Sequence, residues 1–263
     1  MNNLINLPTI NCITLKRLNE RRSIFLDQCR KYNLNYNFIY GYENLKNPSG
    51  EAVEVEGPWL DSMNVGEISG VLSHIKAIKD WFFNSDDEYG FFCEDDLLLS
   101  INEYWSFNWD YVIENLPNGW LAVQLSLIRD LKNENVEDYI KLHPYLWDNW
   151  SACCYLISRK YAKIIIDSYV NGNNSYNLSL QFFPKTVPYI ENVLYNASNK
   201  ENIYTLPLFV ENINVSSSFY PDFIEVKNKN SQKDSSDIVR SWWERNGSKI
   251  DLNWLFNKSI QDS

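Results

Sequence analysis

The first half of the chain alternates short apolar runs with helical stripes. The run Cys12-Ile13-Thr14-Leu15 is typical of a buried strand, and apolar residues recur at helical spacing between residues 19 and 32. Residues 35–40 predict a second strand. Residues 41–63 are punctuated by Gly and Pro and predict a loop-rich segment. The chain therefore opens as strand, helix, strand.

The clearest helix is predicted over residues 67–83. Its apolar positions form one broad stripe, which favours packing of one helix face against a sheet. The stripe consists of Ile68, Val71, Leu72, Ile75, Ile78, Trp81 and Phe82. After a polar connection, an apolar run from Phe91 to Leu99 predicts a buried strand beside this helix.

The middle of the chain predicts further elements of the same two kinds. Residues 120–127 and 151–158 are typical of strands, and residues 161–170 are typical of a helix. Residues 171–180 are rich in Asn, Ser and Gly and predict a surface loop. Alternating strands and helices of this kind indicate the α/β class.

The last part of the chain changes composition. Residues 227–237 are polar and predict a linker, and an aromatic segment with Trp242 and Trp243 follows. We expect one domain over residues 1–226 and a terminal segment, 227–263, that docks on it, because termini stay disordered unless they are tied down. Binding of a partner or a membrane surface by the aromatic residues is the alternative.

Three consecutive acids, Glu94-Asp95-Asp96, interrupt the apolar run at 91–99. Ionised carboxylates are costly to bury unless they are paired or bound to a metal, so they should lie where the strand emerges. In open α/β sheets, ligands collect outside the carboxyl ends of strands. Mg²⁺ and Mn²⁺ are held there by one or two carboxylates together with substrate phosphates. Glu94 and Asp96 therefore predict a metal-diphosphate clamp, with a solvated acidic turn as the alternative.

Charge and cysteine content limit the possible binding partners and the possible cellular location of the protein. The formal net charge is -10, which opposes binding to nucleic acid or anionic lipid. The five cysteines show neither metal-ligand spacing nor the even count of a disulfide framework, so we expect reduced thiols. No apolar stretch reaches the roughly 18 residues of a membrane span. We expect a cytoplasmic protein without a transmembrane segment.

Three motifs in the same order carry a resemblance to a known family. They are Ile13-Thr14-Leu15-Lys16-Arg17-Leu18-Asn19-Glu20-Arg21-Arg22, Gly66-Glu67-Ile68-Ser69-Gly70-Val71-Leu72-Ser73-His74, and the acidic Glu94-Asp95-Asp96. Together they resemble glycosyltransferase family 25, the lipooligosaccharide galactosyltransferases and their relatives, which include the collagen galactosyltransferase domains. The resemblance spans about residues 10–220. Residues 152–162 and 190–194 resemble two later family segments, with Glu191 where Asp is usual.

The resemblance implies a fold and an activity. The fold is of the GT-A type, a mixed, mainly parallel sheet flanked by helices that binds a nucleotide sugar. The activity is inverting transfer of a hexose, galactose or glucose, from a UDP-sugar to a hydroxyl of a glycan, lipid or protein acceptor. Mn²⁺ or Mg²⁺ would assist it. Peripheral association with a membrane, in lipopolysaccharide synthesis, is compatible with this activity.

The motif positions also imply donor-site roles. Asp96 would bind the metal, and Glu94 and Asp95 would complete its shell or hold the ribose. Arg17 and Arg21 follow the first strand, and their guanidinium groups suit the phosphates of UDP. Pairing with Glu20 at the helix surface is the alternative for these arginines.

Ser73 and His74 are assigned to donor binding by the second motif. A neutral imidazole donates a hydrogen bond to sugar or phosphate, or acts as general acid or base near pH 7. The alternative for His74 is a core histidine satisfied by a backbone carbonyl. His143 precedes Pro144 and reads as part of a loop.

An inverting transferase also needs a base for the acceptor hydroxyl. Glu191 is the first candidate and Asp148 the second. Because no histidine follows His143, a late metal ligand would have to come from Glu211, Asn212 or Asn214, or from water.

Aromatic residues at loop edges are candidates for sugar binding. Trp59, Trp147 and Trp150 could stack on apolar sugar faces, with packing as the alternative. Two other activities compete with transfer. One is a non-catalytic protein that binds nucleotide sugars or glycans, and the other is a phosphodiesterase or nucleotidyltransferase that uses the same acids. The absence of a Gly-rich phosphate loop disfavours the latter.

Overall fold

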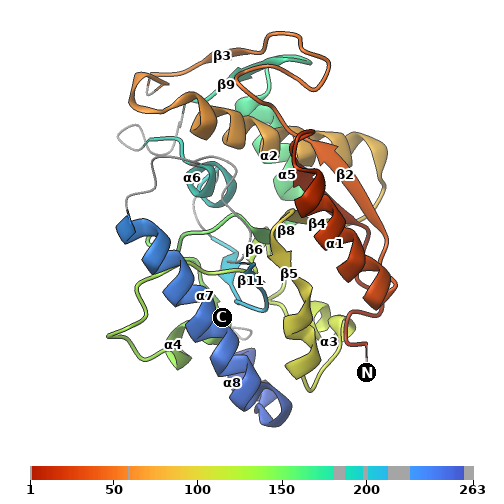
Figure 1. The fold of residues 1–263 in the computed structure, drawn as a ribbon, viewed down its shortest axis with the longest axis vertical. Coiled ribbons are helices and arrows are strands. Elements are labelled where there is room, and N and C mark those ends of the chain that lie inside the picture. Colours follow the sequence, from red (N-terminus) through yellow and green to blue (C-terminus); the bar gives the residue numbers. More distant parts are fainter. Residues whose placement is uncertain (1, 59, 180–186, 198–200, 213–225, 258–263) are drawn as a thin grey trace.

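The protein is described by a computed structural model that covers residues 2–58, 60–179, 187–197, 201–212 and 226–257. Within these residues, the centre is a seven-stranded sheet with the order β2-β1-β4-β8-β6-β10-β7 (Figure 1). Its strands are β1 Ile10–Thr14, β2 Tyr36–Tyr40, β4 Tyr89–Glu94, β6 Ala122–Gln124, β7 His143–Pro144, β8 Cys154–Ser158 and β10 Ile203–Thr205. β7 and β8 run against the other five. The predicted mixed, mainly parallel α/β sheet is confirmed, and it is consistent with a GT-A-like fold.

Helices cover both faces of this sheet. They are α1 Asn19–Tyr32, η1 Leu60–Ser62, α2 Val65–Asn84, η2 Leu99–Tyr104, α3 Trp109–Glu114, α4 Glu137–Ile140, α5 Arg159–Tyr169, α6 Ile190–Tyr195, α7 Val226–Asn246, η3 Gly247–Lys249 and α8 Leu252–Leu255. One core layer joins the sheet to α1, α3, α7 and α8. The other joins it to α2, α5 and α6. Figure 1 shows the second group in the upper part of the view and α7 and α8 in the lower part.

The central strands are buried on both faces, which explains their unbroken apolar sequences. Side chains point to alternate faces of a strand. In β4, Phe91 and Cys93 belong to one core layer and Phe92 to the other, and in β8 Leu156 and Tyr155 divide in the same way. Strands covered by helices on both sides read as continuous hydrophobic runs.

The two long helices predicted in the first half are confirmed. α1 has the predicted bounds. α2 begins slightly earlier than predicted because Asn64 and Glu67 form a capping box, in which each side chain accepts a hydrogen bond from the other residue's backbone N–H. This cap fixes the start of α2 and hence the register of the helix that carries His74.

Two short sheets lie outside the central one. β5 Leu97–Leu98 pairs with β11 Val210–Glu211, and β3 Glu54–Glu56 pairs with β9 Ser175–Asn177. The prediction of a plain loop over 171–180 is therefore wrong for Ser175–Asn177, while residue 180 lies outside the described residues. Strands of two or three residues are too short for a pattern of apolar positions to identify them, and they form because their backbone groups find partners in one another.

The polar segment 227–237 is also different from its prediction. It forms the first half of α7 instead of a linker. Ser235 is buried there, donates to the carbonyl of Leu127 and accepts from the backbone N–H of Arg129. Further along α7, Trp243 is fully buried and its indole N–H donates to the carbonyl of Pro207 at 2.9 Å. The buried contacts of α7 therefore include Ser235, within the polar segment, as well as Trp243.

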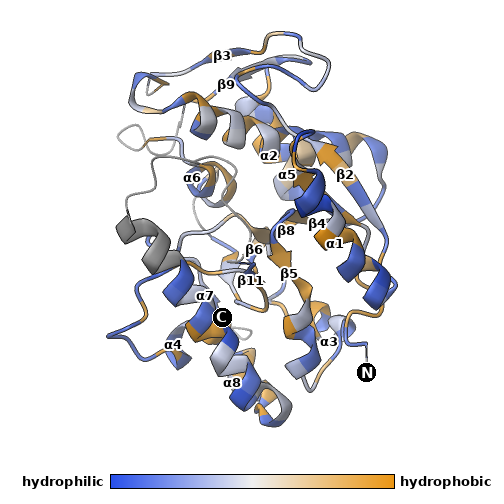
Figure 2. Cartoon of the chain, viewed as in Figure 1, coloured by the Kyte–Doolittle hydropathy of each residue, from blue (hydrophilic) through white to orange (hydrophobic). Residues whose placement is uncertain are grey.

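The helices that the structure describes carry hydrophilic as well as hydrophobic residues (Figure 2). Among them, none has both the length and the apolar character needed to cross a bilayer.

Candidate active site

The three acids lie where two neighbouring parallel strands end. β4 ends at Glu94, and Asp95 and Asp96 form the turn that leads into β5. Glu94 stands opposite Ile13 of β1, whose next residue, Thr14, ends that strand. The predicted position of the acids at a strand's carboxyl end is confirmed.

Arg21 forms ion pairs with two of these acids. Its Nη2 forms an ion pair with Asp95 Oδ1 and lies 2.8 Å from Asp96 Oδ2. The Thr14 hydroxyl donates to the other oxygen of Asp95. Burial raises the pKa of Asp95 to about 6, while Arg21 and Thr14 act in the opposite direction. Asp95 is therefore a buried anchor, because a buried charge is tolerated only when it is paired and hydrogen-bonded.

Glu94 points toward α2 and meets His74. The distance from His74 Nε2 to Glu94 Oε1 is 3.2 Å, and His74 Nδ1 lies 2.8 Å from the hydroxyl of Tyr155. If Glu94 is ionised it can only accept, so Nε2 carries the proton and Nδ1 accepts from Tyr155. Burial lowers the pKa of His74 to about 3, so the ring is neutral. Burial, and then the charge of Asp96, raises the pKa of Glu94 to about 7.

Glu191 is brought to the same place by α6. Burial raises its pKa, and the negative charge of Glu94 acts in the same direction, while the hydrogen bond from the backbone of Ser151 opposes it. The backbone N–H of Ser151 donates to Glu191 Oε1 at 3.1 Å. The first candidate base and the acidic turn therefore belong to one electrostatic cluster.

Ser151 links Glu191 to a further acid. Its hydroxyl donates to Glu211 Oε1 at 3.0 Å, and it lies 2.8 Å from the hydroxyl of Ser126. The φ of Ser151 is +113°, in the region that favours glycine. Strained backbone of this kind persists where the surroundings impose it, and it clusters at functional sites.

Glu211 reaches the site through the pairing of β11 with β5, in which it stands opposite Leu97. The backbone N–H of Asn212 donates to the carbonyl of Asp96 at 2.6 Å. Two of the three late residues considered as metal ligands thus lie beside the acidic turn. The third, Asn214, lies outside the described residues, as does Trp59.

The other predicted site residues have different surroundings. Asp148 is held by Arg129, with 2.6 Å between Oδ1 and Nη1. Arg17 is half exposed and pairs with Glu43. Ser73 accepts from the backbone N–H of Tyr42 and donates to a carbonyl one turn earlier in α2, so it ties the loop after β2 to the helix. Roles for these three in donor binding or catalysis stay predictions.

Arg21, Ser73, His74 and the first two acids line one small cavity of about 20 Å³, together with residues of β1 and the start of α1. Thr14 and Tyr155 were missed by the sequence reasoning. Thr14 is a polar residue closing an apolar strand, which is a usable signal. Tyr155 could be assigned only from its place on the strand face toward α2.

The donor set can be compared with what a divalent metal requires. Among the described residues, no group of three or more His, Cys, Asp and Glu side chains is placed to hold a metal ion. Asp96 offers two oxygens, one near Arg21 and the other 3.6 Å from Cys153 Sγ. Glu94 adds a second carboxylate. Two carboxylates fit a cation that arrives with a diphosphate, which supplies the remaining ligands, and do not fit a closed protein cage.

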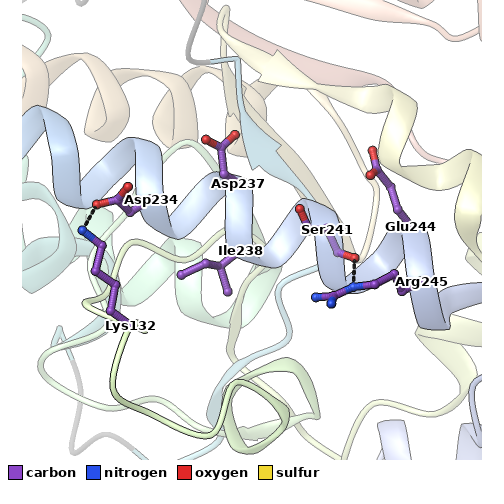
Figure 3. A pocket seen from close by; sticks show the side chains of 7 residues that line it. All are labelled: Lys132, Asp234, Asp237, Ile238, Ser241, Glu244 and Arg245. Carbon is purple, nitrogen blue, oxygen red and sulfur yellow. Dashed lines mark hydrogen bonds and ion pairs between the residues drawn. The ribbon is translucent and has the colours of Figure 1, made fainter.

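A wider hollow of about 640 Å³ lies along α7 (Figure 3). Several of its charged side chains already have partners. Lys132 pairs with Asp234 at 2.5 Å, and Arg245 donates to the carbonyl of Ser241 at 2.9 Å. None of its lining residues belongs to the acidic cluster. Its size therefore does not make it the better candidate, because the reactive groups gather at the end of β4.

Comparison with known families identifies a matching family. The model of glycosyltransferase family 25, described as an LPS biosynthesis protein family, matches residues 8–181, about two thirds of the chain. The matched part contains Arg21, His74 and the three acids, whereas Glu191 and Glu211 lie beyond it. No curated protein sequence matched the chain.

Proposed function

The chain belongs to glycosyltransferase family 25, and on this premise we propose that it transfers a hexose, galactose or glucose, from a UDP-sugar to a hydroxyl of a glycan, lipid or protein with inversion. The observation that carries the proposal is that the acids after β4 and Glu191 of α6 belong to one electrostatic cluster. The turn after β4 holds Asp95 and Asp96 against Arg21, and Glu94 faces the cluster that includes Glu191.

Donor binding is assigned to the turn and to α1. Asp96 and Glu94 would hold Mn²⁺ or Mg²⁺, which as a Lewis acid stabilises the charge that grows on a leaving diphosphate. Arg21 lies within 2.8 Å of Asp96, so its guanidinium is close to any phosphate oxygen that approaches this carboxylate. His74 donates to Glu94 from a fixed ring and so orients that carboxylate.

Glu191 is assigned as the base. The acceptor hydroxyl gives its proton to the Glu191 carboxylate while its oxygen bonds to the anomeric carbon. The bond from that carbon to the diphosphate breaks, and its electron pair leaves with UDP. Burial and the charge of Glu94 raise the pKa of Glu191, which makes the ionised carboxylate a stronger base.

One observation favours a second candidate function. The backbone N–H of Ser151 already occupies one oxygen of Glu191, and Glu replaces the usual Asp. A protein that binds UDP-sugars without transfer would tolerate such an arrangement. It would bind the donor saturably and release no UDP with any acceptor.

UDP release distinguishes the two functions. We expect release from one UDP-sugar of a small panel, dependent on Mn²⁺ or Mg²⁺ and lost with a chelator. Asp96→Asn should lower kcat/KM at least about a hundredfold, because several kcal/mol of charge stabilisation are at stake. Glu191→Gln should lower kcat by about 10²–10⁴-fold while the donor still binds.

Asp86→Asn is the matched control, because Asp86 is an exposed acid in the connection before β4. It should behave as wild type. Full turnover in folded Asp96→Asn would refute the assignment of the acidic turn, and donor binding without turnover in the wild type would favour the binding protein. The cytoplasmic location and peripheral membrane association stay predictions, which cell fractionation would test.

A further inference from the structure

The turn between β7 and β8 presents apolar side chains to solvent. Trp147 is 71% exposed, and Leu146 and Trp150 are each 39% exposed. The other large apolar side chains that are exposed in the described residues lie singly along the chain. A group of exposed aromatic and aliphatic side chains within five positions indicates a binding surface.

This aromatic turn, residues 146–150, is held in place by hydrogen bonds of Asn149 and of the Trp150 backbone. The side chain of Asn149 is fully buried, with its Nδ2 3.1 Å from His143 Nε2 and 3.4 Å from the hydroxyl of Thr205. The backbone of Trp150 pairs in both directions with that of Ile128, at 2.8 and 3.1 Å. His143 lies in a strand and supports the turn, so its earlier assignment to a loop is wrong. The indoles are therefore exposed on an ordered base, which lowers the entropic cost of binding.

The turn continues directly into the acidic cluster. Ser151, which follows Trp150, donates its backbone N–H to Glu191 and its hydroxyl to Glu211. The ring of Trp150 also packs edge to face with Tyr189, 6.4 Å between centroids, just before α6 begins. The candidate base is thus connected to Trp150 twice, through Ser151 and through Tyr189.

We propose that Trp147 and Trp150 form the acceptor subsite and stack against the apolar face of a neutral sugar ring in the acceptor glycan. This proposal rests on the proposed transferase function and names where its acceptor binds. A sugar ring offers a C–H face and a rim of hydroxyls. The face matches a flat indole, and the rim matches carboxylate acceptors such as Asp148, which lies between the two Trp residues in sequence, and Glu191, which accepts from the backbone of Ser151. Asp148 within the aromatic turn and the net charge of -10 disfavour an anionic bilayer as the binding partner.

Direct binding tests the subsite without any transfer reaction. The protein is labelled with 5-fluorotryptophan, and the resonances of the two indoles are assigned with Trp147→Phe and Trp150→Phe. Lactose, cellobiose and maltose are then titrated in the millimolar range. We expect at least one disaccharide to shift both resonances saturably. Trp147→Ala should weaken this binding about tenfold, with part of the affinity kept in Trp147→Phe, because exposed Trp anchors dominate such contacts.

Phe83→Ala is the matched control, because Phe83 is 68% exposed in the last turn of α2, before the start of β4, whereas the acids lie at the end of that strand. It should bind sugar as the wild type does. The proposal is overturned if no disaccharide shifts either indole, or if Trp147→Ala and Phe83→Ala bind equally well. Binding to phosphatidylcholine vesicles containing phosphatidylglycerol, lost in Trp147→Ala without any response to sugars, would identify a membrane surface instead.

The same samples separate this proposal from the proposed function. Suppose that the wild type hydrolyses a UDP-sugar to free sugar and UDP, but that none of the three disaccharides shifts the indole resonances. The acceptor subsite would then be refuted and the transferase function would stand. Suppose instead that a disaccharide shifts the indole resonances, but that the protein neither binds nor hydrolyses any UDP-sugar. The glycan-binding site would then stand and the transferase function would be refuted.

Discussion

His74 and Glu94 face one another between α2 and the end of β4, with 3.2 Å between Nε2 and Oε1. Because burial lowers the pKa of His74 to about 3, the ring offers Glu94 a hydrogen bond and no positive charge at neutral pH. Burial, and then the charge of Asp96, raises the pKa of Glu94 to about 7. Its charge changes within the physiological range, which leads to the first prediction.

Donor affinity should depend on pH through Glu94. With Mg²⁺ present, we expect the affinity for UDP to rise as the pH increases through about 7, because only the ionised carboxylate attracts the cation. Glu94→Gln should bind weakly and lose this pH dependence, whereas Glu88→Gln, at an exposed acid before β4, should keep it. Calorimetry at several pH values measures the effect. An unchanged profile in Glu94→Gln would show that another group titrates.

His74 should destabilise the fold in acid. Below pH 6.5 the unfolded chain binds a proton at this position that the folded ring, with its pKa of about 3, does not bind. Stability is therefore complete above pH 6.5 and falls as the pH drops toward 3, by up to about 1.4 kcal/mol per pH unit. Urea unfolding of wild type and His74→Asn between pH 7 and 4 tests this. The free-energy difference between them should shift steadily in favour of the variant, and a constant difference would argue against a buried neutral ring.

Arg21 should be essential to the fold as well as to the site. Its removal in Arg21→Met leaves Asp95 buried without its cation, which costs about 3–5 kcal/mol. Arg17→Met removes a half-exposed partner of Glu43 and should cost no more than about 1 kcal/mol. Chemical denaturation compares the two. Equal stability of both variants would mean that Asp95 is protonated and not ion-paired.

The backbone at Ser151 allows a paired test of strain. Ser151→Ala and Ser151→Gly both remove the hydroxyl that donates to Glu211, but only glycine adopts a φ of +113° at low cost. We expect the glycine variant to be more stable than the alanine variant by about 1 kcal/mol or more. Thermal unfolding of the two proteins measures this difference directly. If alanine were the more stable, the positive φ would not be under strain.

The docking of the terminal segment can be tested at one indole. Trp243 is fully buried and hydrogen-bonded to Pro207, so Trp243→Ala should cost about 3–5 kcal/mol. Trp147→Ala is the matched control, because that side chain is 71% exposed and its loss should change stability by about 0.5 kcal/mol or less. Similar effects of both changes would place the terminal helix outside the domain.

Much of the fold could be predicted because local pattern and tertiary packing agree. The stripe from Ile68 to Phe82 is long and periodic, and the apolar run before Glu94 needs cover on both sides. The helix at 226–246 lacked such a signal, since its buried contacts include Ser235, a residue type that favours loops. The small sheets were missed because two- and three-residue strands are defined by their partners, not by their own sequences.

The candidate site divides in the same way. The acids at 94–96 could be predicted as a site because three charges within an apolar run are costly to bury without a partner. Their pairing with Arg21 was not visible, because one helical residue among several basic ones acquires its role only when α1 packs beside β4. The position of Glu211 depends on the pairing of β5 with β11, which lie more than a hundred residues apart in sequence.

The burial of β4 on both faces limits how this protein can change over time. From Phe91 to Cys93 every side chain meets one core layer or the other, so a substitution there disturbs a packed interior before it touches the chemistry. New sugar preferences would therefore have to arise in the loops around the strand ends. The rigid strand keeps the reacting groups in place while those loops diverge.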